Sequence, residues 1–265
     1  MRREPKIHYK TPAELVLMRE AGRIVAQVHQ AVRSVVKPGV TTASLNKVAE
    51  EVLRRHNATS PFKNYPDRTG KHPFPASITV SINDELVHGI PGERRLVEGD
   101  IVSIDCGSFH KGFVGDAAFT MGVGQISADA QKLLDVTEQA LYVGIKASVV
   151  GCETRDVSMA IQEYVESHGF SVVREYTGHG VGREMHEDPQ VPNWWPSRQK
   201  RMAWRSFPLR PGMTYAIEPM VNAGGPETRE LDDHWTVVTA DGSLCAHFEH
   251  TIAITDGEPI ILTLP

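Results

Sequence analysis

The sequence predicts an α+β fold in which a single domain of 265 residues consists of two similar halves. One observation behind this prediction is a helical pattern that begins at residue 39 and recurs at residue 151, an offset of 112. The other is an apolar strand with an acidic residue at its end, which recurs at an offset of 113. Fixed offsets of this kind indicate an internal duplication. The halves are expected at roughly residues 12–122 and 127–255 of the chain 1–265.

Capping signals predict the first helix. The segment 11–14, Thr-Pro-Ala-Glu, offers a threonine N-cap, a proline at the first helical position and a glutamate three residues after the cap. Apolar residues then recur at helical spacing, so we expect a helix from about Pro12 to Val36. A second helix is expected after the break at Pro38, with Thr42 as its N-cap.

The second helix and its repeat carry similar residues at each matched position. The pairs are Gly39/Gly151, Thr42/Thr154, Leu45/Val157, Val48/Ala160, Val52/Tyr164, Leu53/Val165 and His56/His168. Any two amphipathic helices would share part of this pattern, so the helices alone leave the duplication open. The acids strengthen it, because Asp105 and Glu218 both end an apolar strand, while Asp116 and Glu249 both enter an alternating run. A pseudo-twofold fold would bring these four carboxylates together between two facing sheets.

Asp105 and Asp116 flank the turn of a predicted buried hairpin. If the two residues pair, the hairpin centre falls between His110 and Lys111, with Gly112 just after the turn. Their Cβ atoms would then lie roughly 4.5–5.5 Å apart on one face. Two buried carboxylates at that separation repel each other and require compensation. A protonated aspartate, a bridging arginine or a metal ion would each provide it.

Three further residues favour the metal ion. His179 lies in a glycine-rich segment, Thr-Gly-His-Gly-Val-Gly, that lets the backbone approach a ligand closely. Glu218 and Glu249 lie beside apolar strands, where an uncompensated carboxylate is costly. Carboxylates with one imidazole suit hard divalent cations better than a structural zinc, and four acids are too many for one ion. We therefore expect a hydrolase with two divalent ions, roughly 3.5–4 Å apart, that activate water.

Composition argues against several other classes of protein. A net charge of −5 does not suit a surface built throughout for nucleic acid. Cys106, Cys152 and Cys245 lack CxxC spacing, so neither a disulfide framework nor a cysteine zinc site is predicted. The basic N-terminus has no apolar stretch behind it, and no segment approaches the ~18–20 apolar residues of a membrane span. We expect a cytoplasmic monomer without a membrane contact.

Six motifs are spread along nearly the whole chain. They are His88-Gly89-Ile90-Pro91, Asp105 with Asp116, Thr177-Gly178-His179-Gly180-Val181-Gly182, His186-Glu187, Ile217-Glu218-Pro219 and Glu249-His250-Thr251. This set resembles the type I methionine aminopeptidases, most closely the bacterial-like members. The resemblance implies the pita-bread fold, in which two pseudo-symmetric helix–sheet halves enclose a dinuclear metal site. It also implies removal of the N-terminal methionine from nascent proteins whose second residue is small.

The resemblance further implies a division of roles among the metal ligands. Asp105 would chelate one ion, and His179 with Glu218 would bind the other. Asp116 and Glu249 would bridge the two ions, which would be Mn²⁺, Fe²⁺ or Co²⁺.

The remaining site residues concern the substrate. By resemblance, His88 would contact the scissile peptide nitrogen, His186 would stabilise the tetrahedral oxyanion, and Glu218 would handle the proton of the nucleophile. An apolar pocket for the methionine side chain is assigned to three residues, each of which could instead be ordinary core. These residues are Phe74, Met185 and Trp235.

Two segments depart from the family pattern. Residues 65–74 cannot be aligned before Phe74, which leaves one wall of the pocket unassigned. Residues 193–210 are longer than the connection expected there and interleave tryptophan with arginine and lysine. Such a composition can bind nucleic acid, so we hypothesise that this segment contacts the ribosome, where nascent chains emerge. A surface loop pinned by its tryptophans is the alternative.

Two other functions stay open. A related pita-bread peptidase of the Xaa-Pro type would carry an extra N-terminal domain, and nothing N-terminal in this sequence is large enough for one. A metal-free pita-bread binding protein would have lost metal ligands. All five candidate positions here hold side chains that can bind a metal, which disfavours that reading.

Overall fold

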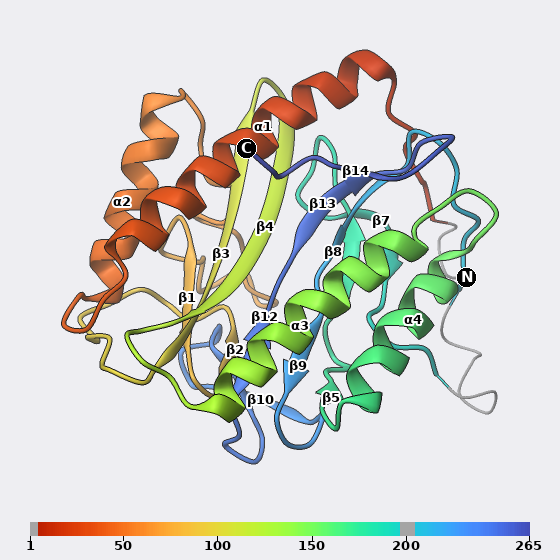
Figure 1. Ribbon diagram of the computed structural model, residues 1–265. Helices are drawn as coiled ribbons and strands as arrows, with labels where there is room; N and C mark the ends of the chain where they lie inside the picture. Colours follow the sequence, from red (N-terminus) through yellow and green to blue (C-terminus); the bar gives the residue numbers. More distant parts are fainter. Residues whose placement is uncertain (1–4, 197–204) are drawn as a thin grey trace.

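The computed structural model describes residues 5–196 and 205–265 and confirms the α+β fold class (Figure 1). Helix α1 (Pro12–Val35) begins with the predicted capping box, in which Thr11 and Glu14 each accept the other's backbone N–H. It ends one residue before the predicted Val36. Because tight capping fixes the first turn, the start of this helix could be predicted to the residue.

Helix α2 (Thr42–Arg55) begins one residue earlier than predicted. Its N-cap is Thr41, which has extended backbone angles and whose hydroxyl accepts the N–H of Ser44 at 3.2 Å. The prediction that Thr42 caps the helix is therefore wrong. Thr42 is already helical, and its hydroxyl hydrogen-bonds the backbone of Gly92 instead.

The remaining helices and the strands follow in chain order. The helices are α3 (Ala128–Ala147) and α4 (Thr154–Ser167). The strands are β1 (Thr79–Ile82), β2 (Glu85–Val87), β3 (Ile101–His110), β4 (Phe113–Gly122), β5 (Ser171–Val172), β6 (Gly178–Gly180), β7 (Glu187–Val191), β8 (Thr214–Ile217), β9 (Met220–Asn222), β10 (Thr228–Glu230), β11 (Val237–Thr239), β12 (Cys245–His247), β13 (His250–Ala253) and β14 (Ile260–Ile261).

In the described part of the chain the strands form four small sheets, and the helices pack against several of their strands. Their orders are β1-β3-β4, β10-β11-β2, β12-β9-β5 and β14-β13-β8-β6-β7. Helix α1 packs on β3 and β4, while α3 contacts β8, β9 and β12. In Figure 1, α1 runs along the top of the view with α2 beside it at the left, and α3 and α4 lie together toward the lower right. Helices α2 and α4 have 14 residues each, and their first residues differ by the predicted 112 positions.

The hairpin of β3 and β4 has a different register from the predicted one. Lys111 and Gly112 form its two-residue turn with φ of 49° and 83°, so Asp105 lies opposite Ala118 and Asp116 opposite Gly107. Two positive φ angles are typical of the turn that matches the twist of a hairpin, and glycine at its second position fits this geometry. The two aspartates are thus diagonal neighbours on one face rather than directly opposite.

The four acids also differ in where they stand along their strands. Asp105 and Asp116 lie inside β3 and β4, so the expectation that Asp105 ends its strand is wrong. Glu218 follows β8 directly and Glu249 lies between β12 and β13, where the pairing is interrupted. The first half therefore uses two continuous strands where the second half uses two interrupted ones.

The two halves meet along β4. The N–H of Glu249 donates to the carbonyl of Ala118 at 2.9 Å, and the N–H of Ala118 donates back to Glu249 at 3.3 Å. Next to this pair the hydroxyl of Thr251 accepts the N–H of Asp116 and donates to its carbonyl. The contact between the halves thereby sets Asp116 and Glu249 side by side. Within the described residues, no helix combines the length and the apolar composition needed to cross a bilayer.

Candidate metal centre

Five segments of the chain, on or directly beside strands of both halves, bring the candidate ligands to one cavity. The cavity has a volume of about 970 Å³, and every residue singled out from the sequence for the site lines it. These residues are Phe74, His88, Asp105, Asp116, His179, Met185, His186, Glu218, Trp235 and Glu249. The structure thus gathers residues that are up to 175 positions apart in sequence, from Phe74 to Glu249.

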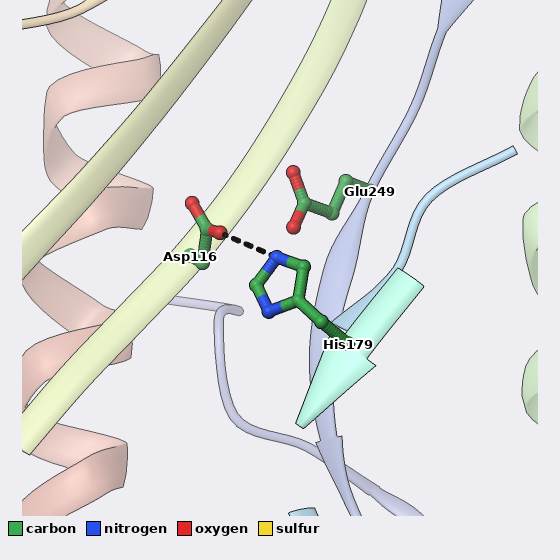
Figure 2. A group of neighbouring side chains, drawn as sticks. All are labelled: Asp116, His179 and Glu249. Atoms are coloured by element: carbon green, nitrogen blue, oxygen red, sulfur yellow. Dashed lines mark ion pairs between the residues drawn. The ribbon is translucent and has the colours of Figure 1, made fainter. Parts of the chain in front are cut away.

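His179 stands at the centre of the candidate ligands. Its Nε2 lies 3.7 Å from Asp116 Oδ2 and 3.5 Å from Glu218 Oε1. One ligand atom each of Asp116, His179 and Glu249 lies within 4.8 Å of the others, and Figure 2 shows the three side chains pointing toward one another. Asp105 adjoins this group through its diagonal neighbour Asp116.

Neighbouring glycines fix the orientation of His179. A Cβ on Gly178 would lie 2.4 Å from the carbonyl oxygen of Ala216, and one on Gly180 would lie 2.4 Å from that of Asp188. The strand can therefore pack between its neighbours only with glycine on both sides of the histidine. His179 Nδ1 donates to the carbonyl of Gly180 at 3.0 Å, which leaves Nε2 with a free lone pair toward the carboxylates. Burial lowers the pKa of His179 to about 3, so the imidazole is neutral.

The carboxylates are buried without adequate hydrogen bonding. Among the described residues, Asp105 Oδ1, Asp116 Oδ1 and Glu249 Oε1 are buried with no hydrogen-bond partner. Burial raises the pKa of Asp116 to about 7. Burial and the charges of the neighbouring acids raise the pKa of Asp105, Glu218 and Glu249 well above their usual range. No arginine or lysine is paired with them in the described residues, so the bridging-arginine alternative does not hold.

This donor set fits divalent ions. Four carboxylates and one neutral imidazole, several of them with unpaired lone pairs, are the ligands that hard or borderline divalent cations accept. Positive charge between the carboxylates would remove the repulsion that raises the pKa values of these acids. The cluster therefore has the ligand types of a metal site, and it lacks the positive charge that a bound metal ion would supply.

Two further histidines, His88 and His186, line the cavity. His88 has a φ of 61° directly before Gly89, where a Cβ would lie 2.2 Å from the carbonyl oxygen of Val80. This tight approach directs the His88 ring toward Trp235, at a centroid distance of 6.1 Å. The His186 ring lies 4.2 Å from the ring of His179. Burial lowers the pKa of His88 to about 4 and also lowers that of His186.

The three predicted pocket residues form an apolar wall. Phe74 and Trp235 pack edge to face at a centroid distance of 5.1 Å, and Met185 packs against the same cluster. Phe62 joins them, and Trp235 Nε1 donates to the carbonyl of His72 at 2.8 Å. The segment that could not be aligned from the sequence thus closes this wall.

Sequence reasoning missed several residues of the site. The hydroxyl of Tyr65 forms a hydrogen bond with His186 Nδ1 at 2.8 Å. Lys6, His8, Tyr9 and Lys10 from the N-terminal segment also line the cavity, and Lys10 forms an ion pair with Glu187. His247 is buried with Nε2 at 3.9 Å from Glu249 Oε2. Only His247 carried a usable signal, because it lies two positions before Glu249 beside an alternating strand.

Comparison with known proteins agrees with this site. The model of metallopeptidase family M24 matches residues 16–256. The chain is 52% identical to methionine aminopeptidase 1 of Bacillus subtilis (strain 168) over 254 residues, which are 96% of this chain and 98% of that protein. It is 42% identical to methionine aminopeptidase of Escherichia coli (strain K12) over 260 residues, 97% of this chain and 94% of that protein.

Solved structures extend the comparison to the fold. Methionine aminopeptidase from Thermotoga maritima superposes with a TM-score of 0.91 at 43% identity, covering 98% of this chain and 100% of that one. Prolidase from Pyrococcus furiosus shares the fold alone, with a TM-score of 0.74 at 18% identity over 97% of this chain and 65% of that one. These matches confirm the pita-bread fold. The chain therefore belongs to metallopeptidase family M24 and, within that family, to the methionine aminopeptidases.

Proposed function

We propose that this chain is a metal-dependent aminopeptidase that removes the N-terminal methionine from nascent proteins with a small second residue. The observation that carries the proposal is the group of four carboxylates beside the neutral His179, of which Asp116 and Glu249 are buried, in one cavity with the apolar wall. Unpaired carboxylates with raised pKa values, gathered in a cavity, are typical of a functional site. Its relatives at 42–52% identity are methionine aminopeptidases.

We assign two divalent ions to this cluster. Asp105 would hold one ion, His179 and Glu218 the other, and Asp116 and Glu249 would bridge them. Mn²⁺, Fe²⁺ and Co²⁺ each accept such a donor set. When bound, the ions would polarise the scissile carbonyl and activate a water molecule at neutral pH.

The protein's own side chains would bind the substrate and manage its protons. Glu218 Oε1 faces the cavity beside His179, where it can accept a proton from the attacking water. With the Tyr65 hydroxyl donating to Nδ1, the neutral His186 ring carries its proton on Nε2 and can donate a hydrogen bond to the developing oxyanion. His88, neutral over the physiological range, can contact the peptide nitrogen.

The apolar wall favours a methionine side chain. Phe74, Trp235 and Met185 offer ring faces and a thioether, which pack well against a soft, unbranched side chain. Phe74 is 2% exposed, and the half-buried Met185 and Trp235 pack against the same cluster, so this wall of the pocket is formed before any substrate binds.

A substrate panel tests the proposed function. Metal-free protein is titrated with Mn²⁺, Fe²⁺ and Co²⁺ and offered Met-Ala-Ser beside Xaa-Pro dipeptides. We expect methionine release from Met-Ala-Ser alone, lost in Asp105→Asn and kept in Asp129→Asn, which alters an exposed aspartate on α3. Cleavage of Xaa-Pro substrates would establish the prolidase-type alternative. Absence of both metal binding and activity after reconstitution would establish the metal-free binding protein.

The partner proposal concerns residues 193–210. Residues 197–204, with Arg198, Lys200, Arg201 and Trp204, lie outside the described part of the chain. Trp194 donates its indole N–H to the carbonyl of Arg174 at 3.2 Å, which supports the pinned-loop alternative for that tryptophan. We propose that the basic remainder contacts the ribosome and that the protein acts as a cytoplasmic monomer. Deleting residues 195–205 should then reduce cosedimentation with ribosomes at moderate salt, and unchanged cosedimentation would reject the contact.

A further inference from the structure

The loop that carries Met185 and His186 has no regular secondary structure of its own. It connects β6 and β7 and runs from Val181 to His186. Backbone hydrogen bonds tie its first two residues, Val181 and Gly182, to Thr214 and Val114, whereas Met185 and His186 lie beyond that attachment. If His186 is to stabilise a transition state, contacts with the rest of the protein must hold this loop in one position.

The carboxylate of Glu187 is that anchor. Its Oε1 accepts the backbone N–H groups of Arg183 at 2.7 Å and Glu184 at 3.3 Å, which folds the loop back onto its own end. Its Oε2 accepts from Lys10 Nζ at 2.6 Å. Burial alone would raise the pKa of Glu187, but the ammonium group of Lys10 and the backbone N–H groups outweigh burial. The pKa is lowered overall, so the carboxylate is charged.

Lys10 reaches this carboxylate from the other end of the sequence and is itself fixed. Its side chain is 5% exposed, its Nζ also donates to the carbonyl of His8 at 3.2 Å, and its backbone N–H donates to Gly212 at 2.7 Å. A Cβ on Gly182 would lie 2.6 Å from Lys10 Nζ and 2.4 Å from Glu187 Oε1. The glycine in the loop is thus what lets the ion pair form against the backbone.

We propose that Lys10 is a positioning residue for His186, acting through Glu187 to hold the loop Gly182–His186 against the metal cavity. Removal of the ammonium group leaves a buried carboxylate short of one partner, and the carboxylate then moves toward water. The N–H groups of Arg183 and Glu184 lose their acceptor at the same time. His186 can stabilise the transition state only from a narrow range of positions. Displacing it should therefore weaken stabilisation of the transition state more than binding of the substrate.

This inference rests on the proposed function, and two measurements keep the two apart. The first is hydrogen exchange of peptides covering residues 180–188 in the metal-free protein, which requires no activity. Lys10→Met should speed exchange there, Lys10→Arg should restore most of the protection, and Arg55→Met, which removes an exposed ion pair on α2, should change nothing. Unchanged exchange in Lys10→Met would overturn the inference whether or not the protein is a methionine aminopeptidase.

The second measurement is a double-mutant cycle on methionine release. Lys10→Met should lower kcat about tenfold to a hundredfold with KM within about twofold. In a His186→Ala background the same substitution should lower kcat by less than about twofold, because the group it positions is gone. An equal loss in both backgrounds would show a merely structural role and overturn the proposal. If the unaltered protein releases no methionine, the proposed function fails and the exchange experiment alone decides the inference.

Discussion

Substituting Asp116 by asparagine should stabilise the metal-free protein while abolishing its activity. The folded chain holds the Asp116 proton more tightly than the unfolded chain, because burial raises the pKa from 3.8 to about 7. The free energy of unfolding of the metal-free protein therefore falls as pH rises from about 4 to about 7. Asparagine fills the same space without the charge, so the free energy of unfolding of the variant should not fall over this pH range on account of position 116.

The magnitude follows from the size of the pKa shift. Each pKa unit corresponds to about 1.4 kcal/mol, so the gain of Asp116→Asn is about 4 kcal/mol at pH 8 and about 2 kcal/mol at pH 5. Water entering the open cavity reduces both values and leaves their order unchanged. At about 2–4 °C per kcal/mol, the midpoint of thermal unfolding should rise by roughly 10 °C at pH 8.

The assay is thermal and urea unfolding of chelator-treated protein at several pH values. Asp100→Asn is the matched control, because Asp100 is also buried but its oxygens accept the N–H groups of Asn83 and Val97, so this variant should be less stable. Addition of Mn²⁺ or Co²⁺ should stabilise the unaltered protein and leave Asp116→Asn unchanged. A metal-free Asp116→Asn that is less stable than the unaltered protein at pH 8 would refute the electrostatic reasoning.

Three further predictions concern the site. His186→Ala should lower kcat about 10²–10³-fold with a small change in KM, measured by steady-state methionine release, because it removes a donor to the oxyanion. Trp235→Ala should raise KM for Met-Ala-Ser more than it lowers kcat, since the pocket wall binds substrate and transition state alike. Gly178→Ala should weaken metal binding in equilibrium dialysis, because its Cβ would meet the carbonyl of Ala216 and displace His179; unchanged affinity would contradict that steric argument.

The parts of the fold set by local chemistry were predictable. The start of α1 followed from its capping box, and the match of α2 with α4 followed from a repeated pattern of small and apolar residues. The N-cap of α2 was misplaced because two threonines stand in succession, and either can cap a helix. Which one does so depends on Gly92, which hydrogen-bonds Thr42 from a distant loop.

The residues of the site likewise fall into those that the sequence predicted and those that it did not. Its carboxylates and histidines stand in short motifs with unusual chemistry, so they could be identified from the sequence and all line one cavity. The centre of the hairpin was misplaced by one residue, which shifts the partner of Asp105 from Asp116 to Ala118, because the symmetric choice around the two aspartates ignored the preference of Gly112 for a positive φ. Lys10 could not be found at all. An ordinary lysine before a helix gives no hint of a carboxylate 177 positions away.

The most direct test of the account is the metal content of the protein together with its activity. Metal-free protein dialysed against Mn²⁺ or Co²⁺ should bind two ions per chain, measured by elemental analysis, and should release methionine from Met-Ala-Ser only in that form. Asp105→Asn should reduce the content to about one ion, because its carboxylate is assigned to one ion alone. Full methionine release in the presence of a strong chelator, or no bound ion under any condition, would contradict the account.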